Sequence, residues 1–447
     1  MKHSTRLAAA LAAFALAVAA CGGGSSSPSS GGSTTAAGGA TQFADLSGQS
    51  LEVAGAWGGS EQKSFTQVLK DFQDKTKATV KYTSFGDNLQ PVLGPRIKGG
   101  NPPDIAFMPN VGILQQYVQQ GALKPLSQDV ISEIDKNYAS VWKTLATVNG
   151  KVYGVPFKGA NKSTVWYRTD SFDQAGVQEP KTWDDFTKAL QTLSDSGVAS
   201  PLSIGGGDGW TLTDWFENIY IRVAGPDKYD QLSKHEIKWT DPTVKQSLTM
   251  LGQLFSKSNL IVGGNKGALQ TLFPQSVTNV FGQTPKGAVV YEGDFVATNI
   301  AQETKSKVGT DAKFFDFPSI NGSKPAVVGG ADIAVVLKDG KAAQELMKYL
   351  ATPEAGAVWA KLGGFTSPNK NVDLSSYSDD TTRKSAEALV NAGDSFRFDM
   401  SDLAPASFGG TPGAGEWKIL QDFLANPTDV DGTAQKLETA AAKAFGN

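Results

Sequence analysis

From residue 51 onward, the sequence alternates short β-rich runs with segments of helical periodicity. The run LEVAGA is followed by FTQVLKDF, which places Phe65, Val68, Leu69 and Phe72 on one face of a helix. The strand-like TVKYTSF, a helical stretch ending at RIKGG, the strand-like DIAFM and the helical GILQQYVQQG follow in turn. This alternation predicts an α/β fold with a parallel sheet covered by helices.

The pattern changes at TVNGKVYGVPF, where Asn149-Gly150 between β-rich flanks predicts a two-residue hairpin. The next run, STVWYRTD, is typical of a strand. TWDDFTKALQTL then begins with Thr182 three residues before Asp185, as in a helix capping box. Further helices and short strands continue to the C-terminus, so we expect a second lobe from this part of the chain.

The first twenty residues have the pattern of an export signal. Lys2 and Arg6 precede the apolar LAAALAAFALAVAA, which ends in small residues and is too short to span a bilayer. We therefore expect residues 1–20 to be removed. Residues 21–42 begin with Cys21 and are otherwise nearly all Gly, Ser, Thr and Ala, a composition that predicts a flexible linker.

Rare residue types exclude several kinds of site. Cys21 is the only cysteine among 447 residues, so an intramolecular disulfide and a thiolate cluster are impossible. His3 lies in the leader, and His235, in the polar run LSKHEIKWTD, is interpreted as a surface-loop residue. A histidine-rich zinc site is excluded, and a Ser-His-Asp triad would require His235. Carboxylate chemistry is the one enzymatic option left, and we expect no metal and no cofactor.

Two local motifs resemble ligand-binding loops, but each lacks a residue that such a loop requires. GGGDG, residues 205–209, resembles part of a phosphate-binding loop but lacks the GK[ST] ending. PTDVDGTAQKLE has EF-hand spacing at Asp429, Asp431 and Glu438, but its first ligand position is Pro427. We predict a capped terminal helix there, with a weak calcium site as the alternative. The net charge of −3, with dispersed Lys and Arg, predicts no nucleic-acid partner.

Longer segments carry a resemblance to a family. PPDIAFMPN, GKVYGVPFKGANKSTVWYRTDSFDQAGVQEPKTWDDF, VVYEGDF, VVGGADIAVV and LATPEAGAVWAKLGGFTSPN resemble, in their order and spacing, the extracellular solute-binding proteins (family 1) of bacterial carbohydrate ABC importers. The resemblance runs from about residue 50 to the C-terminus. GGDGWTLTDWFENIYIRVAGP and RFDMSDLAPASFGGTPG look most like members assigned to α-glucosides. VAAC also resembles the lipobox of bacterial lipoproteins, in which the cysteine, here Cys21, is lipidated.

The resemblance implies a periplasmic-binding-protein-like fold of two α/β lobes, joined by crossing strands, that close by a hinge on a sugar in the cleft between them. It implies a monomer on the extracytoplasmic face of the bacterial cell membrane, lipid-anchored, that delivers its sugar to ABC permease subunits. We expect residues 43–157 and 328–365 in the N-terminal lobe. Residues 158–327 and 366–447 are expected in the C-terminal lobe.

A sugar has apolar C–H faces and a ring of hydroxyls, so its site needs flat aromatic rings and polar groups such as carboxylates. GAWGGSE, SFGDN, GDGWTLTDW and YEGDF each place an aromatic residue beside Asp, Glu or Asn at a strand-to-helix junction. In open α/β sheets, ligands bind outside the carboxyl ends of strands. Together with the resemblance, this predicts ligand-binding roles for Trp57, Glu61, Asp87, Asn110, Lys158, Asn161, Trp210, Asp214, Glu292, Asp294, Phe295, Gly329 and Gly330.

Each role has a structural alternative. Trp57 and Trp210 are the expected stacking platforms, whereas four other tryptophans are expected in the core: Trp183, Trp239, Trp359 and Trp417. Asp294 would accept hydrogen bonds from two sugar hydroxyls beside Phe295, or it would cap the following helix together with Glu292. Asp87 and Asn110 are explained equally well by turns.

Two further positions and the function itself also have alternatives. At the start of a helix, one of Asp214 and Trp215 is expected to face the cleft and the other the core. Gly329 and Gly330, which separate two strand-like runs, would bring backbone N–H groups to a ligand or form a bulge. The functional hypothesis is capture of an α-linked di- or oligosaccharide without catalysis. The alternative is a secreted glycosidase with two carboxylates about 5 to 9.5 Å apart, and binding of peptides or metal chelates would need a charge-lined or tyrosine-lined cleft.

Overall fold

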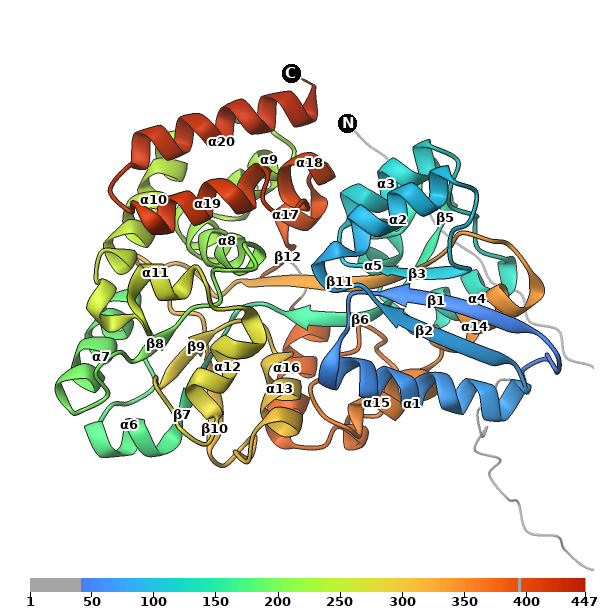
Figure 1. Cartoon of the computed structure of the whole chain (residues 1–447), viewed down its shortest axis with the longest axis horizontal. Coiled ribbons are helices and arrows are strands. Elements are labelled where there is room, and N and C mark those ends of the chain that lie inside the picture. The colour runs from blue at the N-terminus through green and yellow to red at the C-terminus, as the bar shows by residue number, and fades with distance from the viewer. Residues whose placement is uncertain (1–41, 393–394, 447) are drawn as a thin grey trace, which may run out of the picture. The chain divides into compact units, whose positions relative to one another are not determined.

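The computed structural model describes residues 42–392 and 395–446, and Gln42–Asn447 form one compact unit. A six-stranded sheet and a four-stranded sheet lie side by side in this unit, each with its own helices and hydrophobic core (Figure 1). We call the first sheet with its helices lobe 1 and the second lobe 2. The predicted two-lobed α/β fold is confirmed. The predictions for residues 1–41, including lipidation of Cys21, lie outside the described residues.

The elements follow one another as three consecutive groups. The first group is β1 (Ser50–Gly55), α1 (Gly59–Thr76), β2 (Thr79–Ser84), η1 (Gly86–Asn88), α2 (Leu89–Lys98), β3 (Ile105–Met108), α3 (Val111–Gln119), α4 (Gln128–Asn137), α5 (Ser140–Leu145), β4 (Thr147–Val148), β5 (Lys151–Val152) and β6 (Gly154–Asn161). The second is β7 (Thr164–Arg168), α6 (Thr169–Ala175), α7 (Trp183–Asp195), β8 (Leu202–Ser203), α8 (Trp210–Ala224), α9 (Pro226–Ser233), α10 (Pro242–Phe255), η2 (Ser258–Leu260), α11 (Gly264–Ala268), α12 (Phe273–Phe281), β9 (Val289–Tyr291), α13 (Val296–Glu303) and β10 (Ala312–Asp316). The third is β11 (Val327–Val336), α14 (Lys341–Leu350), α15 (Pro353–Ala360), η3 (Leu374–Ser376), α16 (Asp380–Asn391), β12 (Phe396–Phe398), α17 (Met400–Leu403), α18 (Ala406–Gly409), α19 (Gly415–Ala425) and α20 (Val430–Phe445).

The sheet of lobe 1 has the order β12-β11-β3-β1-β2, and β6 pairs with β11. Strands β1, β2 and β3 are parallel, as the strand-helix alternation predicts, whereas β11 runs antiparallel to both β3 and β6. Helices α1 and α15 cover one face and α2 and α3 the other (Figure 1). The apolar face predicted for α1 is confirmed, because Phe65, Val68, Leu69 and Phe72 are all buried.

Two local sequence signals take the predicted conformations. Asn149 and Gly150 both have positive φ, 49° and 74°, between the antiparallel strands β4 and β5. Positive φ at both central residues is what a type I′ hairpin requires. Thr182 Oγ1 accepts a hydrogen bond from the backbone N–H of Asp185 at 3.1 Å and thereby caps α7.

Two strands link the lobes. Strand β11 pairs with β12, β6 and β3 in the lobe 1 sheet, while Val328 near its start packs in the hydrophobic core of lobe 2. After β6, the chain passes through Lys162 and Ser163 into β7 of lobe 2. The prediction that Gly329 and Gly330 separate two strands is wrong, because β11 is continuous across them. A Cβ atom on Gly329 would lie 2.4 Å from the Phe396 ring, so this glycine permits close packing of strands.

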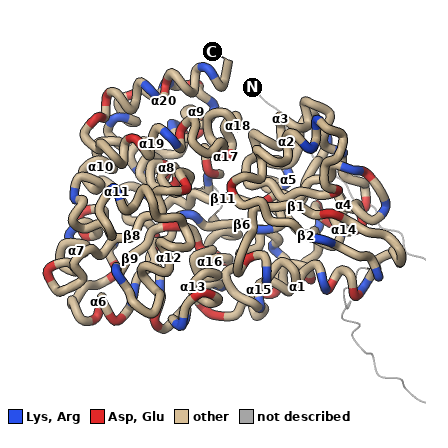
Figure 2. Tube along the Cα trace, in the orientation of Figure 1, with Lys and Arg blue, Asp and Glu red and all other residues tan. Residues whose placement is uncertain are grey.

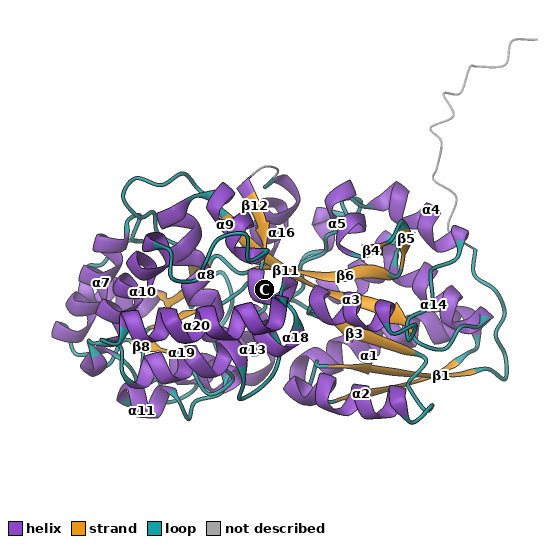
Figure 3. Cartoon of the chain, turned by 90° about the horizontal axis from the view of Figure 1, so that it is seen from above, coloured by secondary structure: helices purple, strands orange, loops and turns teal. Residues whose placement is uncertain are grey.

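Lobe 2 has the sheet order β10-β7-β9-β8 and is rich in helices. Helix α8 packs on α10 and α19, and α20 lies along α19 (Figures 1 and 3). Along the traced backbone, Lys and Arg alternate with Asp and Glu over both lobes and do not gather into one basic stripe (Figure 2). Among the described residues, no helix is both long enough and apolar enough to cross a membrane. The predicted lobe boundaries remain predictions.

Candidate functional site

A small cavity lies where the two lobes meet. Its volume is about 70 Å³, and side chains of both lobes line it, including Asp87 and Asn110 from lobe 1 and Asp402 and Trp417 from lobe 2. Asp87 belongs to η1, directly after β2, and Asn110 follows β3. These two predicted site residues therefore lie at the carboxyl ends of parallel strands, where ligands of α/β sheets bind.

Direct contacts between the lobes surround this cavity. Asn110 Nδ2 donates to the backbone oxygen of Ser401 at 3.1 Å, and its Oδ1 accepts from Ile113 N as the cap of α3. The carboxyl groups of Asp87 and Asp208 are hydrogen-bonded to each other. Burial and the Asp208 charge raise the pKa of Asp87 to about 7. The lobes are therefore closed on each other in this structure.

Lys162, which directly follows β6, lies among acidic side chains of lobe 2. Its Nζ is 2.5 Å from Asp399, 3.2 Å from Asp214 and 3.6 Å from Asp402. Burial acts to raise the pKa of Asp399, but the charge of Lys162 together with hydrogen bonds from Asp214, Glu217 and Lys162 holds that pKa below its usual range. Burial and the charge of Asp399 raise the pKa of Asp402 well above normal. One lysine thus compensates only part of this acidic cluster.

Glu292 lies beside the same cluster, and both of its carboxyl oxygens lack a donor among the described residues. Oδ2 of Asp214 also lacks a donor, and the carboxyl groups of Asp214 and Glu292 are in contact. Both residues are fully buried, at 1% and 0% exposed. Burial raises the pKa of Glu292 to about 8 and that of Asp214 well above normal. A buried carboxylate is costly unless it is paired, so this contact retains a proton at neutral pH.

Lys158, on β6 itself, has a different acidic environment. Its Nζ lies 2.7 Å from Glu61 of α1, and Asp332 of β11 and Asp294 of lobe 2 are its other acidic neighbours. Asp332 accepts a hydrogen bond from Trp57 Nε1 at 3.0 Å. Asp294 accepts from the hydroxyls of Thr366 and Ser385. The acidic neighbours of Lys158 therefore have partners inside the protein.

The prediction that Glu292 and Asp294 cap the next helix is wrong. Helix α13 begins after Phe295 without a side-chain cap. Asp294 is only 4% exposed, and in this closed form its hydrogen bonds go to protein hydroxyls. Asn161 is engaged in the same way, since its Oδ1 accepts from Ser163 N at 3.0 Å and its backbone oxygen from Asp294 N. Gly329 and Gly330 are paired with Asn161 and Ala160 in the sheet.

The aromatic residues divide between core and cleft. Trp210, Phe273 and Phe295 form a cluster in lobe 2 with ring centroids 5.3 to 6.0 Å apart. Nζ of Lys162 lies 5.7 Å from the Trp210 ring and Nζ of Lys158 5.3 Å from the Phe295 ring. Trp210 and Phe295 are half-buried, so they remain candidates for contact with a ligand.

Trp57 does not have the open ring face that a stacking platform needs. It is 4% exposed and packs among the rings of Phe65, Phe107, Phe157 and Trp359. The aromatic residue that sequence reasoning missed is Trp417, which lines the inter-lobe cavity although its helical context predicts core. The other three tryptophans expected in the core are buried there: Trp183, Trp239 and Trp359.

Trp215 lies in the core of lobe 2, whereas Asp214, also fully buried, contacts Lys162, so the expectation that Asp214 faces the cleft stays a prediction. Lys162, Asp208, Asp399 and Asp402 were not foreseen. A signal did exist for two of them, since Asp399 and Asp402 lie in the segment RFDMSD that resembles α-glucoside binders. Lys162 offers no comparable local signal, because its acidic partners come from distant parts of the chain.

The segments with calcium-like and phosphate-loop-like spacing have structural roles in lobe 2. Asp429 caps α20, and Asp431 and Glu438 lie within that helix, so the segment is not a calcium-binding loop. No cluster of three or more potential metal ligands occurs in residues 42–392 and 395–446. Asp208 of the GGGDG segment accepts from Phe273 N at 2.6 Å. His235 is not an exposed loop side chain, because its Nε2 lies 3.2 Å from Glu438 and its ring is 5% exposed.

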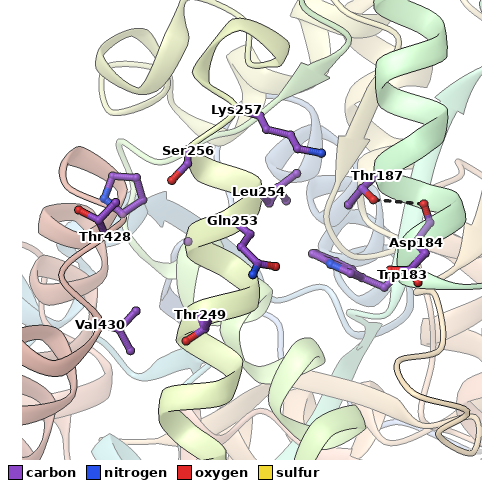
Figure 4. Close-up of a pocket in the computed structure, with 12 residues that line it drawn as sticks. Trp183, Asp184, Thr187, Thr249, Gln253, Leu254, Ser256, Lys257, Thr428 and Val430 are labelled. Carbon is purple, nitrogen blue, oxygen red and sulfur yellow. Dashed lines mark hydrogen bonds between the residues drawn. The ribbon is translucent and has the colours of Figure 1, made fainter.

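A larger pocket of about 560 Å³ opens elsewhere in lobe 2 (Figure 4). Trp183, Asp184 and Thr187 reach it from α7, and Thr249, Gln253 and Leu254 from α10. The segment before α20 forms its other wall. Because all of its lining residues belong to one lobe, closure of the lobes cannot enclose a ligand there. The cavity between the lobes is therefore the better candidate.

Comparisons with known proteins identify relatives of this chain. The alpha-glucosides-binding periplasmic protein AglE of Rhizobium meliloti is 32% identical over 401 residues, covering 87% of this chain and 86% of the relative. The osmoprotective compounds-binding protein GgtB of Synechocystis sp. is 32% identical over 396 residues, covering 87% and 91%. The structure of RafE in complex with raffinose superposes with a TM-score of 0.72 at 18% identity, over 89% of this chain and 99% of that one.

A comparison with protein-family models shows which family the chain belongs to. The family model described as bacterial extracellular solute-binding protein matches residues 58–357, which is more than half of the chain. Those residues include β6, β11 and the acidic clusters of Lys158 and of Asp214 with Glu292. The chain belongs to the bacterial extracellular solute-binding protein family.

Proposed function

We propose that this protein captures an α-linked di- or oligosaccharide between its lobes, closes on it, and delivers it to the permease of an ABC importer. The observation that carries the proposal is the cavity lined by both lobes, with Trp417, Asn110 and two carboxyl groups on its walls. Aromatic rings suit the apolar faces of a sugar, and carboxyl and amide groups suit its hydroxyls. The proposal includes no catalytic step.

The names of relatives support the sugar and its linkage. AglE is named for alpha-glucosides, GgtB for osmoprotective compounds, and the RafE structure contains raffinose. AglE and GgtB cover nearly the whole chain at 32% identity. An α-glucoside is therefore the first ligand class to test.

The size of the cavity requires the lobes to move. A volume of about 70 Å³ is several-fold smaller than the roughly 300–1,000 Å³ of usual small-molecule pockets. A disaccharide can enter only after the lobes part along β6 and β11. The ligand then stabilises closure by the difference between its affinities for the closed and open forms.

Calorimetric titration of residues 43–447 is the direct test, because this part contains both sheets and both cores. The panel is maltose, trehalose, sucrose and glucose, with cellobiose as the β-linked control. We expect saturable binding of one α-glucoside with a Kd near 1 μM, or about −8 kcal/mol. Binding of cellobiose alone would contradict the proposed linkage. Sugar hydrolysis that disappears in Asp294→Asn would contradict a purely binding role.

Small-angle scattering tests closure separately. We expect the radius of gyration to decrease when the best-binding sugar of the panel saturates the protein. An unchanged radius would rule out hinge closure while leaving sugar binding intact.

Anchoring through Cys21 is proposed from its lipobox-like context. Expression of the full chain in a bacterium fed a radiolabelled fatty acid should label the protein at the membrane. Cys21→Ser should abolish the label. A label that persists in Cys21→Ser would contradict the proposed anchor.

A further inference from the structure

The region between the lobes contains far more acid than base. Three carboxyl groups surround Lys158 and four surround Lys162, while Asp87 and Asp208 meet without a lysine among their charged neighbours. The lobes and helices cover all of these carboxyl groups, so each is at least partly removed from water. An excess of buried carboxyl groups must be balanced by protons or by other cations.

The cavity itself has acidic walls and no basic side chain. Asp87 and Asp402 line it, and none of its lining residues is Lys or Arg. Asp402 is 3.6 Å from Lys162 Nζ, which lies closer to Asp399 and Asp214. The other charges acting on Asp402 come from Asp399 and Asp332, both negative. The one nearby lysine is therefore already engaged and is not available to an anionic ligand.

A second, independent observation lies behind the cavity wall. Glu292 is 1% exposed and has no donor at either oxygen, and the fully buried Asp214 lacks a donor at Oδ2. Asp214 contacts Lys162 through its other oxygen, Oδ1, at 3.2 Å, and the charge of Lys162 also acts on Glu292. The contact between Glu292 and Asp214 holds a proton at neutral pH, and the two carboxyl groups lie in a region of low dielectric, where a nearby cation would interact strongly with them.

We infer that the cleft sorts saccharides by charge: it binds a saccharide bearing a protonated amine more tightly than the neutral parent sugar, and it rejects one bearing a phosphate. This inference rests on the proposed function. An ammonium group has three N–H donors and no acceptor. It can therefore donate hydrogen bonds to ionised carboxylates on the cavity wall, whereas a neutral sugar leaves those carboxyl groups protonated. A phosphate would add negative charge where no free lysine or arginine lines the wall.

The test is a titration of three matched compounds: trehalose, 6-amino-6-deoxytrehalose and trehalose 6-phosphate. A second series uses maltose with its 6′-amino and 6′-phosphate derivatives. At low salt, we expect the amine to bind on the order of tenfold more tightly and the phosphate at least about tenfold more weakly than the parent. A phosphate that binds as well as the parent, or an amine that binds no better, would overturn the inference.

Charge-neutralising variants connect the effect to these residues. Asp402→Asn and Asp87→Asn keep the side-chain shape and should each lower the amine-to-parent affinity ratio several-fold. The ratio cancels a general loss of binding, and urea denaturation shows whether each variant folds. The matched control is Glu236→Gln, which removes one negative charge from an exposed position of lobe 2 and should leave the ratio unchanged. Equal ratios in all three variants would contradict the assignment.

A measurement without sugar separates this inference from the proposed function. If no compound of either series binds, sugar capture fails, and infrared spectroscopy then decides the charge inference. The ligand-free protein at pH 7 should show the carbonyl stretch of protonated carboxylic acids, reduced in Asp402→Asn. Absence of that band would overturn the inference, because the excess carboxyl groups would then already be balanced by bound cations and an ammonium group would gain nothing over the neutral parent.

Discussion

Lys158 and Lys162 lie four residues apart at the lobe crossing, yet their acidic neighbours differ in how they are satisfied. Around Lys158, Asp332 is bonded by Trp57 and Asp294 by Thr366 and Ser385. Around Lys162, Asp214 and the neighbouring Glu292 leave three buried oxygens without a donor. The first environment is complete within the protein, whereas the second has binding capacity left over.

Under the proposed function, this difference would separate a structural role of the Lys158 group from a ligand-binding role of the Lys162 group. Buried polar groups in proteins are nearly always hydrogen-bonded, so an exception indicates strain, function or an unseen partner. The Lys158 group connects α1 of lobe 1 to lobe 2 and stabilises the closed form. The Lys162 group adjoins the cavity through Asp402. Four substitutions test this contrast, in order of decreasing expected size.

Lys162→Met should cause the largest loss of stability. It removes the only cation within 4 Å of Asp214, Asp399 and Asp402 among the described residues. Loss of one partner of a buried ionic group costs about 3–5 kcal/mol. Urea denaturation should show this loss at pH 8 and a smaller one at pH 5, where the carboxyl groups take up protons. The control, Lys70→Met, breaks an exposed pair with Asp74 and should cost less than about 1 kcal/mol.

Lys158→Met should be less damaging, at about 2–3 kcal/mol by the same measurement. Its carboxylate neighbours keep hydrogen bonds from Trp57, Thr366 and Ser385, and Glu61 is partly exposed. If Lys158→Met destabilised the protein more than Lys162→Met, the contrast between the two groups would be wrong.

Glu292→Gln should stabilise the protein at pH 8. The pKa of Glu292 is raised to about 8 in the folded protein, against an ordinary value of 4.5. The folded form therefore binds a proton that the unfolded form releases between these values, and stability is lost as the pH rises through this window. Glutamine cannot ionise, and its amide can donate to Asp214. We expect a gain on the order of 1–2 kcal/mol at pH 8 and a flatter pH profile.

The result that would contradict this prediction is a Gln variant less stable than the parent protein at pH 8. It would mean that the ionised carboxylate has a partner in the folded state. The matched substitution Glu236→Gln, at an exposed position, should leave the pH profile unchanged.

Trp417→Ala should have the smallest effect, and on binding rather than on stability. Its side chain is half-buried and lines the cavity. Loss of one aromatic contact should weaken binding of the best α-glucoside by about 0.5–1.5 kcal/mol, by analogy with aromatic pairs. Calorimetry measures the change, and Trp57→Phe is the comparison, because Trp57 lies within the lobe 1 core. An equal loss of affinity in both variants would remove Trp417 from the site.

Much of the fold follows from local sequence signals. The apolar period of α1, the Asn149-Gly150 turn and the Thr182 cap all take their predicted conformations. Each depends on residues close together in the chain, where propensity and periodicity act directly. The continuity of β11 across Gly329-Gly330 did not follow in this way. Pairing with β6 and β12 from distant segments overrides the weak strand propensity of glycine.

The candidate site was predictable by region and less so by residue. Asp87 and Asn110, which line the inter-lobe cavity, were singled out because they follow strands, where polar side chains approach a cleft. Asp214 and Glu292 are buried behind Lys162 and do not line that cavity. Trp57 was expected in the site and is buried in the core, whereas Trp417 was expected in the core and lines the cavity. Local sequence context does not reveal which ring lies next to the opposite lobe. Lys162 was missed because Asp214, Asp399 and Asp402 reach it from separate elements.

Three properties of this protein follow from its residues alone: the succession of strands and helices, the likeness to a solute-binding family and the exclusion of disulfide and histidine-rich zinc chemistry. Those properties depend on composition and on order along the chain. Which carboxyl groups are satisfied and which remain without donors is set by the packing of the two lobes. That distinction depends on distances of a few ångströms between distant residues, such as Trp57 and Asp332, which are 275 positions apart, and no local pattern specifies those distances.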